Sequence, residues 1–238
     1  MTIDIAKSFT FMFEDPDWLP KLGIGTLIVL IGLVLSAALV GVVPLIIAAG
    51  YSLEVTANVM NNQAFPLPDW HDWGRFLGRG IKLVVVFVVW LLPLIIPLIL
   101  GAFGGALGNS HSGAVSFVGG LVLTCSVCLS VLWGLVVLLF EPAIYARLAA
   151  TDRISSGFEF VKLWEFTRAN LTNVIVAIIM TIAAGIISLV VALAGTIAIV
   201  IGLLVTVPLA ILWKWLVQAH LFGQVGAPGV APANQATI

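Results

Sequence analysis

Charged side chains are scarce in this sequence. Asp, Glu, Lys and Arg make up 9% of the 238 residues, whereas 61% are hydrophobic and the mean hydropathy is +1.20. A soluble domain usually has about 25% charged and about 45–50% apolar residues. So few charges cannot cover a water-facing surface. This excludes a large soluble domain and indicates a chain whose main solvent is lipid.

Residues that perform chemistry are equally scarce. Cys125 and Cys128 have C-x-x-C spacing, but no third or fourth ligand is near them in the sequence. We therefore interpret them as two small residues on one helix face and not as a metal or redox site. The sequence contains no metalloprotease, nucleophile-elbow, phosphate-loop or dinucleotide motif. We therefore expect no catalytic residue, metal or cofactor and no nucleic-acid partner, and we predict that the protein is not an enzyme.

Long apolar stretches dominate instead, and each reaches the roughly 20 residues that a membrane crossing needs. They cover residues 22–49, 81–108, 115–149, 173–193 and 196–217. The ten-residue alternation of a β-barrel is not visible. The sequence predicts an all-α fold, a polytopic transmembrane bundle of about five helices in a single domain over residues 1–222. The Gly/Pro/Ala-rich residues 223–238 predict a flexible tail.

The ten basic residues decide the predicted orientation. With five crossings, the connections 50–80 and 150–172 share one side with the C-terminus. Lys7 and Lys21 then lie opposite, which leaves eight of the ten with the long connections. The positive-inside rule places those connections in the cytoplasm of a cell membrane. If the first stretch instead turns back near Gly41, all ten share that side; both alternatives stay open.

Residues 69–82 predict an amphipathic helix capped by Asp69. At 100° per residue its aromatic side chains share one face and its basic side chains share the opposite face. This pattern is typical of a helix in the lipid headgroup plane, and packing against the protein's own helices is the alternative. The second long connection repeats the mixture. The predicted lipid-interface residues are Trp70, Trp73, Arg75, Arg79, Lys82, Trp164 and Arg168.

Small residues at four-residue spacing predict close helix packing, with Gly101 and Gly105 as one pair and Gly104 and Gly108 as another. Five helices need such faces among themselves, and a partner would use any left over. Glu141 is the only carboxylate in a long apolar stretch, which makes it a weak functional candidate. It lies about 39 Å along a straight helix from the start of its stretch, which places it near the interface.

Three short elements resemble a known family. They are Phe13-Glu14-Asp15-Pro16-Asp17-Trp18, Gly50-Tyr51 and Leu67-Pro68-Asp69-Trp70. They are similar to elements of the integral-membrane family catalogued as domain of unknown function 4013. The resemblance implies a multi-helix membrane protein, and it implies no activity and no site.

The sequence as a whole favours a non-catalytic accessory or scaffolding subunit. Such a subunit would pack against membrane lipids and against other membrane-protein subunits. The alternative is a transporter or channel-like protein for an uncharged or lipidic solute.

Overall fold

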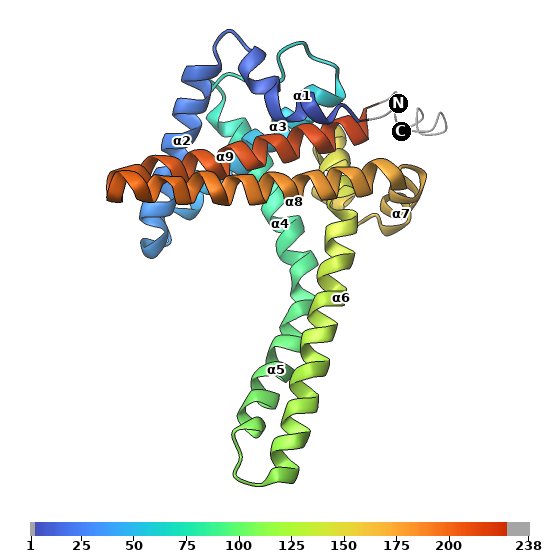
Figure 1. Ribbon diagram of the computed structural model, residues 1–238. Helices are drawn as coiled ribbons and strands as arrows, with labels where there is room; N and C mark the ends of the chain where they lie inside the picture. Colours follow the sequence, from blue (N-terminus) through green and yellow to red (C-terminus); the bar gives the residue numbers. More distant parts are fainter. Residues whose placement is uncertain (1–2, 228–238) are drawn as a thin grey trace.

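A computed structural model describes residues 3–227, apart from the side chains of residues 198–201. Throughout that part of the chain every regular element is a helix, which confirms the predicted fold class (Figure 1). The α-helices are α1 (Ile5–Thr10), α2 (Trp18–Leu35), α3 (Val42–Met60), α4 (Trp73–Leu91), α5 (Ile95–Gly108), α6 (Gly113–Thr151), α7 (Phe160–Ala169), α8 (Leu171–Ala194) and α9 (Ile199–Gly226). Short 3₁₀ turns are η1 (Phe11–Glu14), η2 (Ser36–Ala38), η3 (Leu92–Leu94), η4 (Ile154–Phe158) and η5 (Gly195–Ala198).

Six segments of the described chain are long and apolar enough to cross a membrane. They are Trp18–Ala38, Val42–Met60, Trp73–Gly108, Gly113–Thr151, Leu171–Ile197 and Gly202–Gly226. In chain order they pair into three hairpins: α2 with α3, α4 and α5 with α6, and α8 with α9. The hairpin of α5 and α6 extends away from the rest, and the α8/α9 hairpin lies across its base (Figure 1).

The first apolar stretch, 22–49, is two helices and not one. After α2 and η2 the chain turns at Leu39, which adopts the left-handed region (φ 61°), and α3 begins at Val42. Gly41 permits this return, because a Cβ there would lie 2.2 Å from the carbonyl oxygen of Gly32. The structure therefore matches the alternative in which the chain turns back near Gly41, and six membrane-length helices replace the predicted five.

The hairpins carry no charge at their closed ends. Residues 22–53, 83–140 and 169–213 contain no Asp, Glu, Lys or Arg, and these ranges include the three turns that close the hairpins. All charged side chains therefore lie on the other segments, which adjoin the core.

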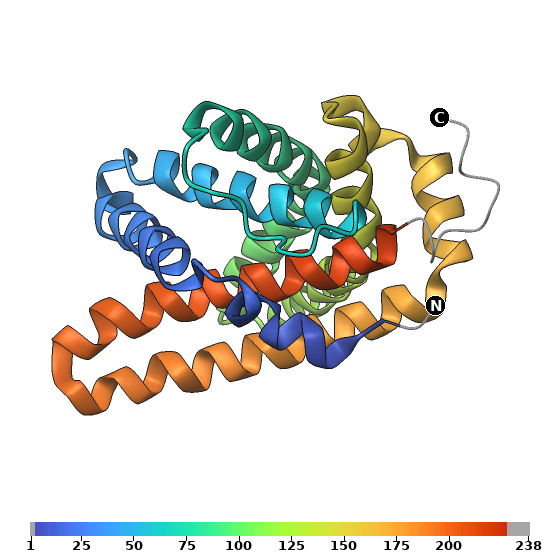
Figure 2. The same cartoon turned by 90° about the horizontal axis from the view of Figure 1, so that it is seen from above.

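The core sits where the open ends of the hairpins meet, and α3 lies at its centre (Figure 2). In the most apolar part of α3, 61% of the residues are buried, compared with 6% in the most apolar part of α6. Most of α6 therefore faces outward. Two glycines bring α3 and α4 together. A Cβ at Gly50 would lie 1.8 Å from the carbonyl oxygen of Phe76, and one at Gly80 would lie 1.9 Å from that of Ile46. This close crossing fixes the α4 side chains described below against α3.

Helix α9 continues past Gly223, where the flexible tail was predicted to begin. The reason is packing: a Cβ at Gly223 would lie 2.7 Å from Cβ of Val59, and one at Gly226 would lie 2.9 Å from Cβ of Ala146. The start of the predicted tail is therefore part of the core. Residues 228–238, the remainder of that tail, lie outside the described residues.

Candidate functional site

The three short elements noted in the sequence meet around Lys21. Its ammonium donates to Asp15 Oδ2 (2.8 Å) and to the Leu67 carbonyl (3.0 Å), and it lies 3.2 Å from Asp69 Oδ1. Its own carbonyl accepts a hydrogen bond from the indole of Trp70 (2.8 Å). Lys21 therefore fastens the start of α2 to the connection that precedes α4.

Tyr51 completes this arrangement from α3. Its ring stacks on Trp70, with centroids 4.0 Å apart and planes 7° from parallel. Its hydroxyl donates to the Pro68 carbonyl (3.0 Å), and Phe76 of α4 packs edge-on against Trp70 at 5.4 Å. Both Tyr51 and Trp70 are buried. The short elements thus form a packed structural junction and not an open site.

This junction also shifts the start of α4. The helix begins at Trp73, and Asp72 caps it by accepting a hydrogen bond from the backbone N–H of Arg75 (3.0 Å). The predicted cap, Asp69, is held by Lys21 instead. Trp70 consequently lies in the turn before the helix and not on its aromatic face.

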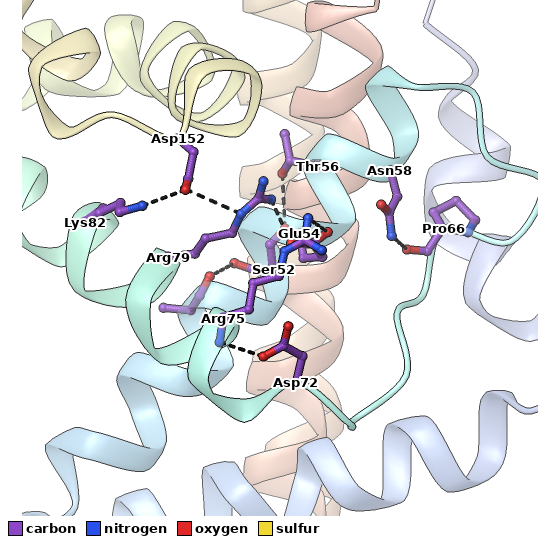
Figure 3. Close-up of polar contacts among 11 residues, drawn as sticks. Ser52, Glu54, Thr56, Asn58, Pro66, Asp72, Arg75, Arg79, Lys82 and Asp152 are labelled. Carbon is purple, nitrogen blue, oxygen red and sulfur yellow. Dashed lines mark hydrogen bonds and ion pairs between the residues drawn. The ribbon is translucent and has the colours of Figure 1, made fainter.

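An ion network joins α4 to α3 and to the end of α6 (Figure 3). Glu54, buried in α3, forms ion pairs at 2.8 Å with Arg75 and with Arg79. Arg79 Nε lies 3.6 Å from Asp152 Oδ1, and Lys82 donates a 2.7 Å hydrogen bond to Asp152 Oδ2. Burying such a pair costs desolvation, and the loss of either partner would leave the other charge buried without compensation.

Glu54 was not predicted from the sequence, because residues 50–80 were interpreted as a connection, whereas α3 runs to Met60. The sequence does contain an indication of an acidic partner. Arg75, Arg79 and Lys82 share one helix face, and a basic face next to apolar helices needs a counter-ion.

The lipid-interface residues divide into two groups in the structure. Trp70 and Arg79 are buried against protein. Trp73, Trp164 and Arg168 are exposed, Arg75 is about half exposed, and Lys82 retains 29% of its side-chain exposure. Contact with lipid headgroups stays a prediction for these five.

Helix α7 is attached to α6 by a smaller ion pair. Glu159 pairs with Arg147 of α6, and Lys162 lies 3.2 Å from the same carboxylate oxygen. The hydrogen bond from Lys162, with the nearby Arg147 charge, holds the pKa of the Glu159 carboxyl below its ordinary value.

The four predicted helix-packing glycines differ in whether α6 packs against them. A Cβ at Gly101 would lie 2.7 Å from Ser126 Oγ, and one at Gly104 would lie 2.6 Å from the backbone nitrogen of Leu123. Both glycines are therefore used inside the α5/α6 hairpin. Gly105 and Gly108 have nothing within 4 Å of the added Cβ, but the Gly108 carbonyl accepts a hydrogen bond from Ser116 of α6 (2.8 Å), so only Gly105 lies outside the contact.

Glu141 is joined to Gln218 of α9 and, through Gln218, to Lys214. Gln218 donates its amide to Glu141 Oε1 (2.5 Å) and accepts a hydrogen bond from Lys214 (2.8 Å). We call Glu141, Gln218 and Lys214 the Glu141 cluster. It borders a cavity of about 290 Å³ among α3, α4, α6 and α9. Only the first of the three residues was singled out in the sequence, because nothing local links it to α9.

A helical bundle with six membrane-length apolar segments, and with its charges confined to segments next to the core, is a multi-pass membrane protein. The chain belongs to the family described as "Protein of unknown function (DUF4013)", whose model matches residues 33–197. That range includes Gly50-Tyr51 and the Leu67–Trp70 element. No curated protein and no solved structure matches the chain.

Proposed function

We propose that the protein is a non-catalytic accessory or scaffolding subunit, which packs against other membrane proteins and lipids. One observation carries the proposal. The α5/α6 hairpin extends away from the core (Figure 1) and presents glycines whose Cβ position the rest of the described chain leaves open: Gly105, Gly120 and Gly134. In lipid, where helix association gains nothing from the hydrophobic effect, small residues allow the close approach that holds helices together.

Contact with lipid is supported by a second feature. A cavity of about 480 Å³ between α2 and the α8/α9 hairpin is walled almost entirely by apolar side chains. Phe13, Trp18 and Trp213 are among its lining residues, and such aromatic side chains are typical of the membrane–water interface. A lipid acyl chain fits the chemistry of this wall.

We also propose an orientation in the cell membrane. Both long connections and both ends of the described chain lie at the core end of the α5/α6 hairpin (Figure 1), and all ten basic residues lie on segments next to that core. The positive-inside rule makes that side cytoplasmic.

A matched pair of substitutions tests the scaffold proposal. Gly105→Leu places bulk on the uncovered face, whereas Gly104→Leu places it in the contact with α6. After extraction in mild detergent, we expect Gly105→Leu to melt like the wild type but to lose co-purifying subunits in fixed ratio. Gly104→Leu should lower the melting temperature itself. If Gly105→Leu kept every associated subunit, or if the wild type had none, the proposal would be wrong.

A second candidate function is transport of an uncharged or lipidic solute, and the cavity beside the Glu141 cluster favours it. Purified protein in liposomes distinguishes the two. A transporter gives solute flux above that of protein-free liposomes, and a scaffold gives none.

A further inference from the structure

We propose that the cavity beside the Glu141 cluster binds an uncharged amphiphile, meaning a molecule with a hydrogen-bonding head such as a hydroxyl group and a single aliphatic tail. The proposal goes beyond the scaffold function and does not depend on it. It rests on the polar wall of the cavity, on its apolar wall and on where it opens.

The polar wall can bind a head group that both donates and accepts hydrogen bonds. The hydrogen bonds within the cluster use one carboxylate oxygen of Glu141 and one of the three ammonium donors of Lys214. The second oxygen of Glu141 and further donors of Lys214 remain for a ligand. Ser52 of α3 and Tyr145 of α6 add hydroxyl groups to the same lining, and the Ser52 hydroxyl, which donates to the Ala49 carbonyl (2.7 Å), can still accept a hydrogen bond. A hydroxyl head is complementary to this mixture, because it donates to the carboxylate and accepts from the ammonium.

A second part of the lining is apolar and belongs to α4. Leu83, Val84 and Phe87 line the cavity, and so do Val88 and Leu91. Val88 is 53% exposed and Leu91 is 45% exposed, so the cavity opens on the outer, apolar face of a membrane-length helix. A tail can therefore reach it sideways from the bilayer. At about 290 Å³ the cavity lies just below the usual size of ligand pockets, roughly 300–1,000 Å³. This volume suits one short chain better than a two-chain phospholipid.

The charges of the cluster select against an ionic head. Glu141 as a carboxylate and Lys214 as an ammonium sum to zero, and they still sum to zero if the proton moves from one to the other. A charged head would add one uncompensated charge in a region of low dielectric, which is unfavourable for any lone buried ion. A neutral head adds none.

The test uses the full chain in lipid nanodiscs and a dodecanol analogue with a photoreactive diazirine in its tail. We expect crosslinks to lining residues of α4, α6 or α9. Unlabelled 1-dodecanol should compete about tenfold better than dodecanoate, dodecylammonium or dodecane, since each of these leaves a charge or a polar group unmatched. Equal competition by dodecane would overturn the proposal, because the apolar wall alone would then account for binding.

Two variants probe the site and a third is a matched control. Val88→Trp fills the opening, whereas Val89→Trp adds the same ring on the exposed face of α4 outside the cavity lining. We expect crosslinking to fall at least about tenfold in the first and to stay unchanged in the second. Glu141→Gln leaves the Lys214 charge unbalanced, so dodecanoate should become the better competitor. Equal crosslinking in the two Trp variants, or an unchanged preference in Glu141→Gln, would refute the site. Neither result bears on the subunits lost in Gly105→Leu.

Discussion

The ring of Tyr51 lies flat on the indole of Trp70, with centroids 4.0 Å apart. The two residues belong to different short elements of the family resemblance, and the second of them also binds the backbone of Lys21. In this chain the elements are therefore parts of one structural junction, which positions α2, α3 and α4 relative to one another. The junction explains the elements without requiring an active site.

The junction predicts a large difference between two tryptophans. Trp70→Ala removes a buried indole, its stack and its hydrogen bond, so we expect a loss of about 3–5 kcal/mol in unfolding free energy. Trp73 is 44% exposed, and Trp73→Ala should cost less than about 1 kcal/mol. Denaturation of the purified variants in detergent measures both. Equal losses of unfolding free energy in the two variants would show that the stack with Tyr51 does not stabilise the fold.

The ion network predicts a similar contrast among charged residues. Glu54→Gln removes the buried counter-ion of Arg79 and leaves it only the half-exposed Asp152 at 3.6 Å, which should cost about 3–5 kcal/mol in unfolding free energy. Lys82→Gln weakens a pair with the half-exposed Asp152, and pairs of that kind contribute about 0–1 kcal/mol. The same denaturation assay applies. A stable Glu54→Gln protein beside an unstable Lys82→Gln protein would contradict the assignment of Glu54 as the central anion.

Glu159 predicts a pH dependence for the attachment of α7. The pKa of its carboxyl is lowered in the folded protein, mainly by the hydrogen bond from Lys162. The ion pair therefore stabilises the fold above the unfolded pKa of about 4.3 and stops doing so as the pH falls through the lower folded value. Amide hydrogen exchange in α7 should be slower in the wild type than in Glu159→Gln at pH 7, and the difference should vanish in acid.

Glu165 provides the control for this experiment. It lies on α7, is exposed, and makes no ion pair within the described part of the chain. Glu165→Gln should leave exchange in α7 unchanged at either pH. A difference between wild type and Glu159→Gln that persisted in acid would mean that the carboxyl acts through something other than its charge.

Single cysteines placed in a variant without Cys125 and Cys128 test the orientation. With six crossings, Thr10→Cys, Gln63→Cys and Arg153→Cys lie on one side and Ser110→Cys lies on the other. In intact cells an impermeant maleimide should label only Ser110→Cys. Labelling of Thr10→Cys together with Ser110→Cys would restore five crossings, and labelling of Gln63→Cys would reverse the orientation.

The sequence predicts the helices well because lipid imposes a simple rule of length and apolarity. It fails at the turn near Leu39, because residues 37–40 are as apolar as the helices beside them and hydropathy alone shows no break. The return depends instead on the close approach of Gly41 to Gly32.

Charge pairing is harder to predict than helices. The partner of Arg79 is Glu54, on another helix, and the partner of Glu141 is Gln218, on a third. Each pair depends on which helices are adjacent, and helix adjacency is not encoded in local pattern. The basic face of α4 could be predicted from spacing, whereas its buried counter-ion could not.

The uncharged closed ends of the three hairpins have a consequence for membrane insertion. Moving one elementary charge through a potential of 100 mV requires about 2.3 kcal/mol. No Lys, Arg, Asp or Glu lies in residues 22–53, 83–140 or 169–213, so a hairpin that enters from its closed end carries none of these charges through the field. The free energy of inserting each hairpin is then set by the transfer of its apolar side chains from water to lipid. Insertion should therefore proceed equally in an energised and in a depolarised membrane.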